Sequence, residues 1–303
     1  MIIPEKDIER LEGMGYRFVG KNKHTAVKIC GWTKNSLVGQ GVCYKQKFYG
    51  IKTHRCMQMS PAVPFCKHRC LFCWRDTSIT NPEWKGPYDR PDEIIDESIE
   101  AQRELLSGFK GNEKADPKMV KEAFNPNQVA ISLAGEPMEY PMISELIKAF
   151  KERKFSVFTV TNGTRPDVVE KLEEPTNLYV TLPAPNEEIY KKTCIPLKNS
   201  WENIMKTLSL LKNFSCNTVV RLTLVKGLNF VKPDEYAKIV EKYEPDFLEV
   251  KSFMSVGYSR QRLPYEVMPT HKEIEDFSRE IEKNSGYRKK NESVPSRIVL
   301  MKK

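Results

Sequence analysis

Long apolar stretches are absent from this 303-residue sequence, and their absence excludes a membrane-spanning helix. No apolar run approaches the roughly 20 residues that are needed to cross a bilayer. The N-terminus also lacks the basic start and the apolar segment of a signal peptide. We therefore expect a cytoplasmic protein with no membrane partner. In that compartment, the eight cysteines indicate metal or redox chemistry in preference to disulfides.

Acidic residues are scarce in the first quarter of the chain. Residues 1–75 contain fourteen Lys and Arg but only four Asp and Glu, whereas the net charge of the whole chain is +9. A basic face beside a reactive site favours a polyanionic substrate such as nucleic acid. The alternative is a solvated basic surface without a ligand, and this is how we interpret a second basic run at residues 288–290.

Internal repeats, low-complexity tracts and long linkers are missing as well, and strands alternate with helices along the chain. Strands are expected at residues 57–63, 128–133, 155–161, 178–182, 218–225 and 247–251. Helices are expected at residues 8–14, 92–106, 112–124, 142–153, 166–172, 201–211, 234–243 and 271–284, before a last apolar run at 298–301. This alternation predicts βαβ units with a parallel sheet, and a site at the carboxyl ends of the strands.

Residues 64–75 carry the most specific chemistry in the sequence. Cys66, Cys70 and Cys73 stand at C-x3-C-x2-C spacing on one short segment. A 4Fe-4S cubane takes one ligand per iron, so three thiolates leave one iron open to another molecule. Structural zinc normally takes four ligands in two separated C-x2-C pairs, and no second pair follows Cys73. His68 could complete a zinc site only by straining the same segment, so the spacing favours iron and sulfide.

Cys30, Cys43 and Cys56 form a second set of three, spaced thirteen positions apart. They lack the C-x2-C pairing of zinc ribbons and fingers. They are able to hold a second cluster with one open iron. The alternative is three unrelated buried thiols, which is how we interpret the remaining cysteines, Cys194 and Cys216.

The C-x3-C-x2-C segment, with Phe72 directly before its last cysteine, resembles the motif of the radical S-adenosylmethionine superfamily. This resemblance implies an α/β fold, the partial TIM-like (β/α)6 barrel, with the cluster segment after the first strand. Gly135 and Glu136, after the second strand, match the superfamily's Gly-Gly-Glu, which holds the methionyl ammonium of S-adenosylmethionine. Ala134 replaces the first glycine, and an ordinary strand-ending turn is the alternative.

Three more residues are expected to contact the cofactor because of their positions on or directly after the expected strands. Asn162 would reach the ribose, while Arg221 and Thr223 would face the carboxylate of the cofactor. About half of such residues on a parallel strand point outward into the helix layer instead, where they are structural.

The sequence resembles the family of tRNA 4-demethylwyosine synthases. The resemblance is carried by residues 43–51, the evenly spaced cysteines and residues 60–75. The resemblance covers essentially the whole chain. It implies a basic N-terminal extension at residues 1–57 that carries a second iron–sulfur site, and a radical S-adenosylmethionine core with a C-terminal extension at residues 58–303. The implied enzyme is a carbon–carbon lyase of wyosine biosynthesis. It condenses N1-methylguanosine, next to the anticodon of tRNA-Phe, with two carbons of pyruvate.

The same resemblance implies the cofactors and partners: two 4Fe-4S clusters, S-adenosylmethionine and an external flavodoxin- or ferredoxin-like electron donor. The donor is external because the chain has no room for the flavodoxin-like domain of eukaryotic relatives, so we expect an archaeal single-domain enzyme, acting as a monomer. Lys45, two positions after Cys43, would pair with the carboxylate of pyruvate or form a Schiff base with its ketone. The tRNA phosphates would be held by Lys21, Lys23, Lys28, Arg55 and Arg75.

Three other functions are compatible with parts of the sequence. A methylthiotransferase acting on tRNA shares the two clusters and the cofactor, but would not consume pyruvate. A zinc-stabilised RNA-binding module would have no catalysis and would contain zinc instead of iron. An activase that installs a glycyl radical in a partner protein would leave the basic first quarter unexplained.

Overall fold

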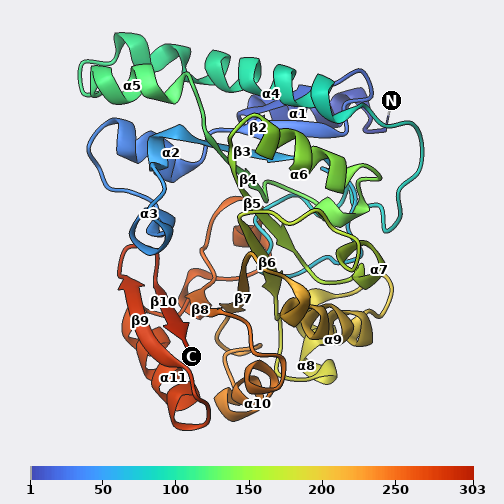
Figure 1. Ribbon diagram of the computed structural model, residues 1–303, viewed down its shortest axis with the longest axis vertical. Coiled ribbons are helices and arrows are strands. Elements are labelled where there is room, and N and C mark those ends of the chain that lie inside the picture. The colour runs from blue at the N-terminus through green and yellow to red at the C-terminus, as the bar shows by residue number, and fades with distance from the viewer. Residues whose placement is uncertain (1) are drawn as a thin grey trace. The chain divides into compact units, whose positions relative to one another are not determined.

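The computed structural model describes residues 2–303, which divide into two compact units. Unit 1 contains the chain up to Phe65, Glu83–Val160 and Leu172–Thr176, and unit 2 contains Cys66–Pro82, Thr161–Lys171 and Asn177–Lys303. Figure 1 labels the helices and strands of both units. Among the described residues, no helix combines the length and the apolar character needed to cross a membrane.

Unit 1 is built on a sheet of five strands in the order β1-β2-β3-β4-β5. The hairpin of β1 (Tyr16–Val19) and β2 (Thr25–Lys28) pairs antiparallel with β3 (Cys56–Ser60). Then β3, β4 (Gln128–Ile131) and β5 (Ser156–Thr161) run parallel. The three strands expected in this part of the chain are present, and the hairpin is an addition that the sequence analysis did not predict.

The helices of unit 1 follow from local sequence signals. In α4 (Pro91–Leu106), Pro91 occupies the first position, where its missing N–H is not needed, and the Glu93 carboxylate accepts a hydrogen bond from the Arg90 backbone N–H at 3.2 Å. The remaining helical segments are α1 (Glu5–Gly13), α2 (Gly31–Leu37), α3 (Tyr44–Tyr49), α5 (Pro117–Ala123) and α6 (Ile143–Glu152), with 3-10 turns η1 (Thr53–Arg55), η2 (Ser107–Gly111) and η3 (Pro137–Glu139).

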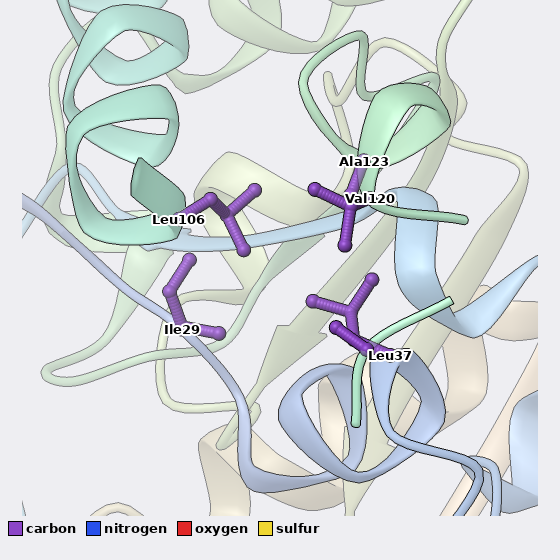
Figure 2. Packing of buried hydrophobic residues seen from close by; sticks show 6 residues of the cluster. Ile29, Leu37, Leu106, Val120 and Ala123 are labelled. Carbon is purple, nitrogen blue, oxygen red and sulfur yellow. The ribbon is translucent and has the colours of Figure 1, made fainter. Parts of the chain in front are cut away.

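A hydrophobic cluster holds α2 against α4 and α5 (Figure 2). Leu37 of α2 and Leu106 of α4 are fully buried, and Val120 and Ala123 of α5 complete the cluster beside Ile29. Ile29 directly precedes Cys30, which in turn caps α2. The cluster therefore fixes the backbone on both sides of a predicted metal ligand.

Unit 2 also contains a five-stranded sheet, in the order β6-β7-β8-β10-β9. The strands β6 (Asn177–Thr181), β7 (Asn217–Leu224) and β8 (Phe247–Ser252) run parallel, while β10 (Ile298–Lys302) and β9 (Arg288–Ser293) continue the sheet antiparallel. Its helical segments are α7 (Pro166–Val169), α8 (Glu187–Cys194), α9 (Trp201–Leu210), α10 (Pro233–Tyr243) and α11 (His271–Lys283), with 3-10 turns η4 (Leu211–Asn213), η5 (Gly257–Gln261) and η6 (Tyr265–Val267).

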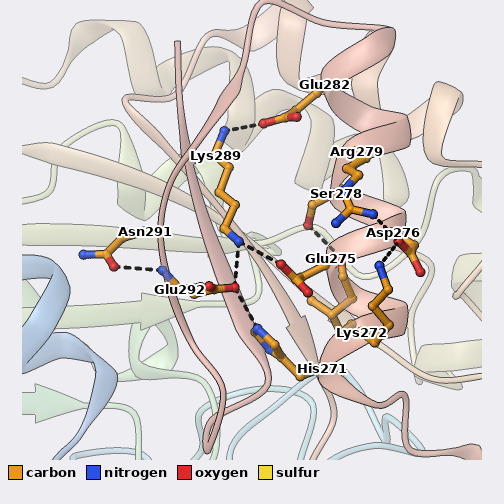
Figure 3. Close-up of polar contacts among 11 residues, drawn as sticks. His271, Lys272, Glu275, Asp276, Ser278, Arg279, Glu282, Lys289, Asn291 and Glu292 are labelled. Atoms are coloured by element: carbon orange, nitrogen blue, oxygen red, sulfur yellow. Dashed lines mark hydrogen bonds and ion pairs between the residues drawn. The ribbon is translucent and has the colours of Figure 1, made fainter.

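A network of charged residues joins α11 to β9 (Figure 3). The Lys289 Nζ atom lies 2.8 Å from Glu275 Oε1 and 2.7 Å from Glu292 Oε2, and Glu292 Oε2 also lies 2.8 Å from His271 Nε2. Hydrogen bonds from Lys289 and His271 lower the pKa of Glu292 to about 2. The basic run at residues 288–290 is therefore tied into the protein surface by Lys289.

Candidate metal and cofactor sites

The three evenly spaced cysteines come together in unit 1. Cys30 and Cys43 occupy equivalent positions, because each precedes the first residue of a helix with almost the same backbone angles, φ −61° and ψ 141° against φ −62° and ψ 140°. Cys56 is the first residue of β3. Burial is the main cause that raises the pKa of the Cys56 thiol to about 12; Lys45 acts in the opposite direction, and the nearby sulfurs of Cys30 and Cys43 act with burial.

Polar contacts cross-link the segments that carry these cysteines. The Thr53 side chain accepts a hydrogen bond from the Cys43 backbone N–H at 3.1 Å, and its hydroxyl donates to Gln46 Oε1 at 2.9 Å. Gln102, fully buried in α4, donates to the Cys56 carbonyl at 3.3 Å. Each cysteine position is thus defined by neighbouring structure, as a preorganised metal site requires.

Lys45 is buried at this site, with only 7% of its surface exposed. Its Nζ lies 4.6 Å from the centre of the Phe158 ring of β5, and Tyr49 of the same helix, α3, packs on that ring with centroids 6.2 Å apart. Lysine is rarely buried without a functional or electrostatic reason. The structure therefore places Lys45 beside the second cysteine set, as the sequence analysis expected.

The Gly135-Glu136 turn follows β4 and docks on the segment that precedes Cys66. The Glu136 backbone N–H donates to the Phe65 carbonyl at 2.6 Å, and the Ser60 hydroxyl donates to the Ala134 carbonyl. The Glu136 carboxylate is 2% exposed and accepts a hydrogen bond from the Met138 N–H at 3.1 Å. A buried, preoriented carboxylate is suited to binding a cationic group.

The C-x3-C-x2-C segment lies in unit 2, where several donors converge on the Cys66 sulfur. The His68 N–H donates to Cys66 Sγ at 3.4 Å and the Asn162 amide donates at 3.5 Å. Burial alone would lower the pKa of the Arg75 guanidinium, but the nearby sulfurs of Cys66, Cys73 and Cys70 raise it overall. Donors and a buried cation beside three thiols suit thiolate ligation of an iron–sulfur cluster.

Cys194 lies beside this segment, which the sequence analysis did not anticipate. His68, Cys70 and Cys194 have their ligand atoms within 4.8 Å of one another, and a hydrogen bond with Cys194 is the main cause that raises the pKa of Cys70. Around it, the Arg69 N–H donates to the Cys194 carbonyl at 3.0 Å. Cys194 is therefore buried, as expected, but it contacts a predicted cluster ligand.

The neutral imidazole of His68 has a structural role. Burial, with help from Arg75 and Lys67, lowers the pKa of His68 to about 3, and its Nε2 lies 2.7 Å from the Tyr190 hydroxyl. The compact group of His68, Cys70 and Cys194 contains only one cysteine of the predicted ligand set. A zinc site made from all three loop cysteines and His68 is not the arrangement found in residues 2–303.

The other predicted cofactor residues occupy different environments in unit 2. Arg221 and Thr223 share one face of β7, where the Arg221 Nε donates to the buried Glu249 carboxylate at 2.8 Å and the guanidinium lies 4.5 Å from the Tyr179 ring. Phe72 packs on a hydrophobic cluster that includes Phe253. Their contacts with a cofactor remain predictions.

One expectation about the basic residues is wrong. Arg75 is only 5% exposed and donates to the Thr80 hydroxyl at 2.8 Å, so it cannot hold a tRNA phosphate at the surface. Its positive charge lies beside the sulfurs of Cys66, Cys70 and Cys73 instead. Lys21 is exposed, whereas Arg55 is half-buried and donates through Nε and a terminal nitrogen to the Asn125 carbonyl at 3.0 and 2.7 Å.

Comparisons with known proteins identify the family of the chain. A family model described as the radical SAM superfamily matches residues 60–240, and one described as wyosine base formation matches residues 242–303. The S-adenosyl-L-methionine-dependent tRNA 4-demethylwyosine synthase of Pyrococcus horikoshii is 45% identical to the chain, over 99% of this chain and 89% of that protein. The enzyme of the same name from Methanocaldococcus jannaschii is 40% identical, over 99% of this chain and 96% of that protein. A solved structure of TYW1 with a lysine-pyruvate adduct bound is 37% identical, with a TM-score of 0.90 over 100% of this chain and 97% of that one.

Proposed function

Because the chain belongs to the tRNA 4-demethylwyosine synthase family of radical S-adenosylmethionine enzymes, we propose that Lys45 takes up pyruvate as its second substrate. The observation that carries this proposal is the burial of Lys45 beside Cys56 and Phe158. The lysine-pyruvate adduct named for the solved TYW1 structure supports the same assignment. The second set of cysteines and the substrate lysine thus belong to one site in unit 1.

In the proposed reaction, two carbons of pyruvate are condensed with N1-methylguanosine next to the anticodon of tRNA-Phe, and the bond to the remaining pyruvate carbon breaks so that this carbon is released. The Lys45 Nζ lone pair attacks the ketone carbon of pyruvate, a carbon–nitrogen bond forms, and the ketone oxygen leaves as water. The imine holds the substrate in a fixed orientation, so that the carbon–carbon bond can form at a defined atom. The Phe158 ring shields one side of the lysine from water.

The cofactors are proposed to be held by the residues that the sequence analysis identified. Cys66, Cys70 and Cys73 would hold one 4Fe-4S cluster, and Cys30, Cys43 and Cys56 a second. When bound, the first cluster and S-adenosylmethionine supply the radical that removes a hydrogen atom from the substrate methyl group. The proposed contacts with S-adenosylmethionine come from Phe72, Gly135, Glu136, Asn162, Arg221 and Thr223.

The chain's own groups prepare this centre. The Asn162 amide and the His68 N–H donate to the Cys66 sulfur, and the Arg75 guanidinium offsets negative charge beside it. Glu136 offers its carboxylate to the methionyl ammonium. Electrons would come from an external flavodoxin- or ferredoxin-like protein, and the chain would act as a monomer in the cytoplasm.

An anaerobic reconstitution tests the proposed function. We would count iron and sulfide per chain, then add S-adenosylmethionine, a reductant and N1-methylguanosine-containing tRNA, with or without pyruvate. About eight irons and a tricyclic base that forms only with pyruvate are expected. About four irons, or product that forms equally well without pyruvate, would overturn the assignment of the second site.

Trapping identifies the lysine directly. Borohydride reduction in the presence of pyruvate should attach a reduced pyruvate adduct to Lys45, located by peptide mass spectrometry. The Lys45→Arg variant should lose the adduct and the tricyclic product. Lys47→Ala removes an exposed lysine from the same helix and serves as the matched control, which should keep both. An adduct that persists in Lys45→Arg would exclude Lys45.

A further inference from the structure

Arg262 contacts the C-x3-C-x2-C segment of unit 2 at several backbone positions. Its Nε donates to the Leu71 carbonyl at 3.2 Å, and one terminal nitrogen donates to the Cys73 carbonyl and, at 3.4 Å, to the Arg75 carbonyl. The other terminal nitrogen donates to the Thr77 hydroxyl at 3.3 Å. One half-buried side chain thus reaches four acceptors on a segment that is 185 or more positions earlier in the chain.

The residues around Arg262 approach the same segment closely. The Tyr258 N–H donates to the Trp74 carbonyl at 2.9 Å. Gly257 adopts φ +56°, and a Cβ atom at this position would collide with the Trp74 carbonyl oxygen. A glycine is therefore required here both by its backbone angle and by the lack of space.

Apolar contacts complete the interaction on the other side. Leu71 and Phe72 pack on a cluster of buried residues made of Val225, Phe253, Leu263 and Met268. Phe72 and Leu263 adjoin Cys73 and Arg262 in the sequence. The cysteine segment is consequently held by both its backbone and its side chains.

Arginine suits this position for a physical reason. Residues 71–77 lie outside regular helices and strands, so a helix or sheet ladder does not satisfy their carbonyl groups. The guanidinium offers five donors in a rigid planar fork, whereas a lysine ammonium is a compact point charge on a flexible stem. Only the fork can bridge several carbonyl groups of one turn at once.

We propose that Arg262 is a positioning residue for the cluster that Cys66, Cys70 and Cys73 are proposed to hold. It fixes the backbone of Cys73, so the wyosine base formation part of the chain, residues 242–303, determines how firmly the cluster is retained and how S-adenosylmethionine meets it. This inference rests on the proposed assignment of that cluster. Arg262 would act on the cluster through the backbone of Cys73 and its neighbours.

The test uses a parent protein in which Cys30, Cys43 and Cys56 are all replaced by Ala, so that iron reports on the other set alone. The parent should hold about four irons. Arg262→Ala should then release iron to a chelator about 10- to 100-fold faster, the range found when groups supporting metal ligands are removed. It should also weaken the change that S-adenosylmethionine causes in the paramagnetic resonance spectrum of the reduced cluster. Arg262→Lys should release iron at a rate between those of the parent and of Arg262→Ala.

Arg260→Ala is the matched control, because Arg260 is exposed and donates to the Ser255 carbonyl. It should behave as the parent does. Equal rates of iron release in the parent and in Arg262→Ala would overturn the proposal. A parent without iron would instead overturn the cluster assignment, and the proposal with it.

Two further variants keep the test decisive if Arg262→Ala does not fold. Arg262→Lys retains the charge, and parent-like iron release and spectrum in this variant would contradict the need for a planar fork. Gly257→Ala should push the Trp74 carbonyl, and with it the cysteine segment, away from residue 257 and reproduce fast iron release with Arg262 still present. Far-ultraviolet circular dichroism of the metal-free proteins separates these effects from global unfolding.

Discussion

Among the described glycines, Gly135 has the least room for an added side chain. Its φ of +69° lies in the left-handed region, and a Cβ atom would fall on the Ala62 carbonyl oxygen and 2.8 Å from the Phe65 carbonyl oxygen. We expect Gly135→Ala to displace the turn that carries Glu136, at a cost of roughly 1–3 kcal/mol. The measurement is the affinity of the reconstituted protein for S-adenosylmethionine, which should fall by about tenfold or more.

Gly108→Ala is the control for this prediction, since nothing lies within 4 Å of a Cβ atom at Gly108. It should bind the cofactor as the unchanged chain does. An affinity that stays the same in Gly135→Ala would mean that the turn does not contribute to the cofactor site.

The sequence predicted the residues whose spacing carries information. The C-x3-C-x2-C set can be recognised in the sequence because three thiolates that bind one cluster from a single short segment need a short, fixed spacing. This set is Cys66, Cys70 and Cys73. Cys194 and Arg262 carry no such signal, because they approach the cysteines only through the folding of distant segments. Arg75 was misinterpreted because charge in a sequence does not reveal burial, and a buried guanidinium needs only nearby anions.

At the scale of elements, α2 connects the hydrophobic cluster of Figure 2 with Cys30. We expect Leu37→Ala to destabilise unit 1 by about 2–5 kcal/mol, because it leaves a cavity where a fully buried side chain packed. Since α2 begins directly after Cys30, iron bound by the second set should also decrease. Denaturant unfolding and iron counts measure the two effects.

Lys34→Ala changes an exposed residue of the same helix and should leave both quantities nearly unchanged. If Leu37→Ala destabilises the protein but every iron is retained, then α2 does not position Cys30. That result would separate the stability of the helix from the metal site.

The network between α11 and β9 predicts a dependence on pH (Figure 3). The folded pKa of Glu292 is lowered from 4.5 to about 2, so its contribution to stability is fully present above pH 4.5 and is lost as the pH falls toward 2. Glu292→Gln should therefore cost about 1 kcal/mol near neutral pH. The difference in unfolding free energy between Glu292→Gln and the unchanged chain should shrink as the pH falls from 4.5 to about 2.

Urea unfolding of the metal-free protein at several pH values measures this difference. Glu280→Gln serves as the control, because Glu280 makes a surface ion pair with Lys283 within one helix. A destabilisation of Glu292→Gln that is independent of pH would show that the carboxylate charge is not its source.

The elements that the sequence predicted are those with a clear pattern of apolar residues. The strands β3 to β8 lie within a few residues of the expected positions, because buried parallel strands are short, continuous apolar runs. The sequence analysis missed the hairpin β1–β2, the helices α2, α3 and α8, and strand β9. Strand β9 reads Arg288–Ser293 and exposes its charged residues, so only its pairing with β10 defines it as a strand.

At the scale of the whole molecule, the family prediction is confirmed by relatives at 40–45% identity and by the match to the wyosine base formation model. The same match favours this function over a methylthiotransferase, an activase or a zinc module. The α/β fold of the radical S-adenosylmethionine superfamily is confirmed as well. The division into residues 1–57 and 58–303 stays a prediction.

The charge of the first quarter predicts how tRNA binding depends on salt. With fourteen cationic side chains against four anionic ones in residues 1–75, the affinity for tRNA should fall steeply as the salt concentration rises, because counterions released into more concentrated salt gain less entropy. Replacing exposed Lys21 by Ala should reduce the slope of log affinity against log salt by about one if it contacts a phosphate. Filter binding at several salt concentrations measures the slope.

Arg75→Lys should leave that slope unchanged, because Arg75 is buried away from solvent. A slope that does not respond to Lys21, nor to any other exposed lysine of the first quarter, would favour the solvated basic surface. The tRNA would then bind elsewhere on the chain.

The contact between Arg262 and the Cys73 carbonyl spans 189 positions of sequence, and this sets an order of events during synthesis. The cysteine segment leaves the ribosome long before Arg262 and Gly257 have been made. A nascent chain therefore exposes three thiols before Arg262 and Gly257 can fix the backbone around Cys73. We expect this segment to retain iron firmly only after the chain is complete.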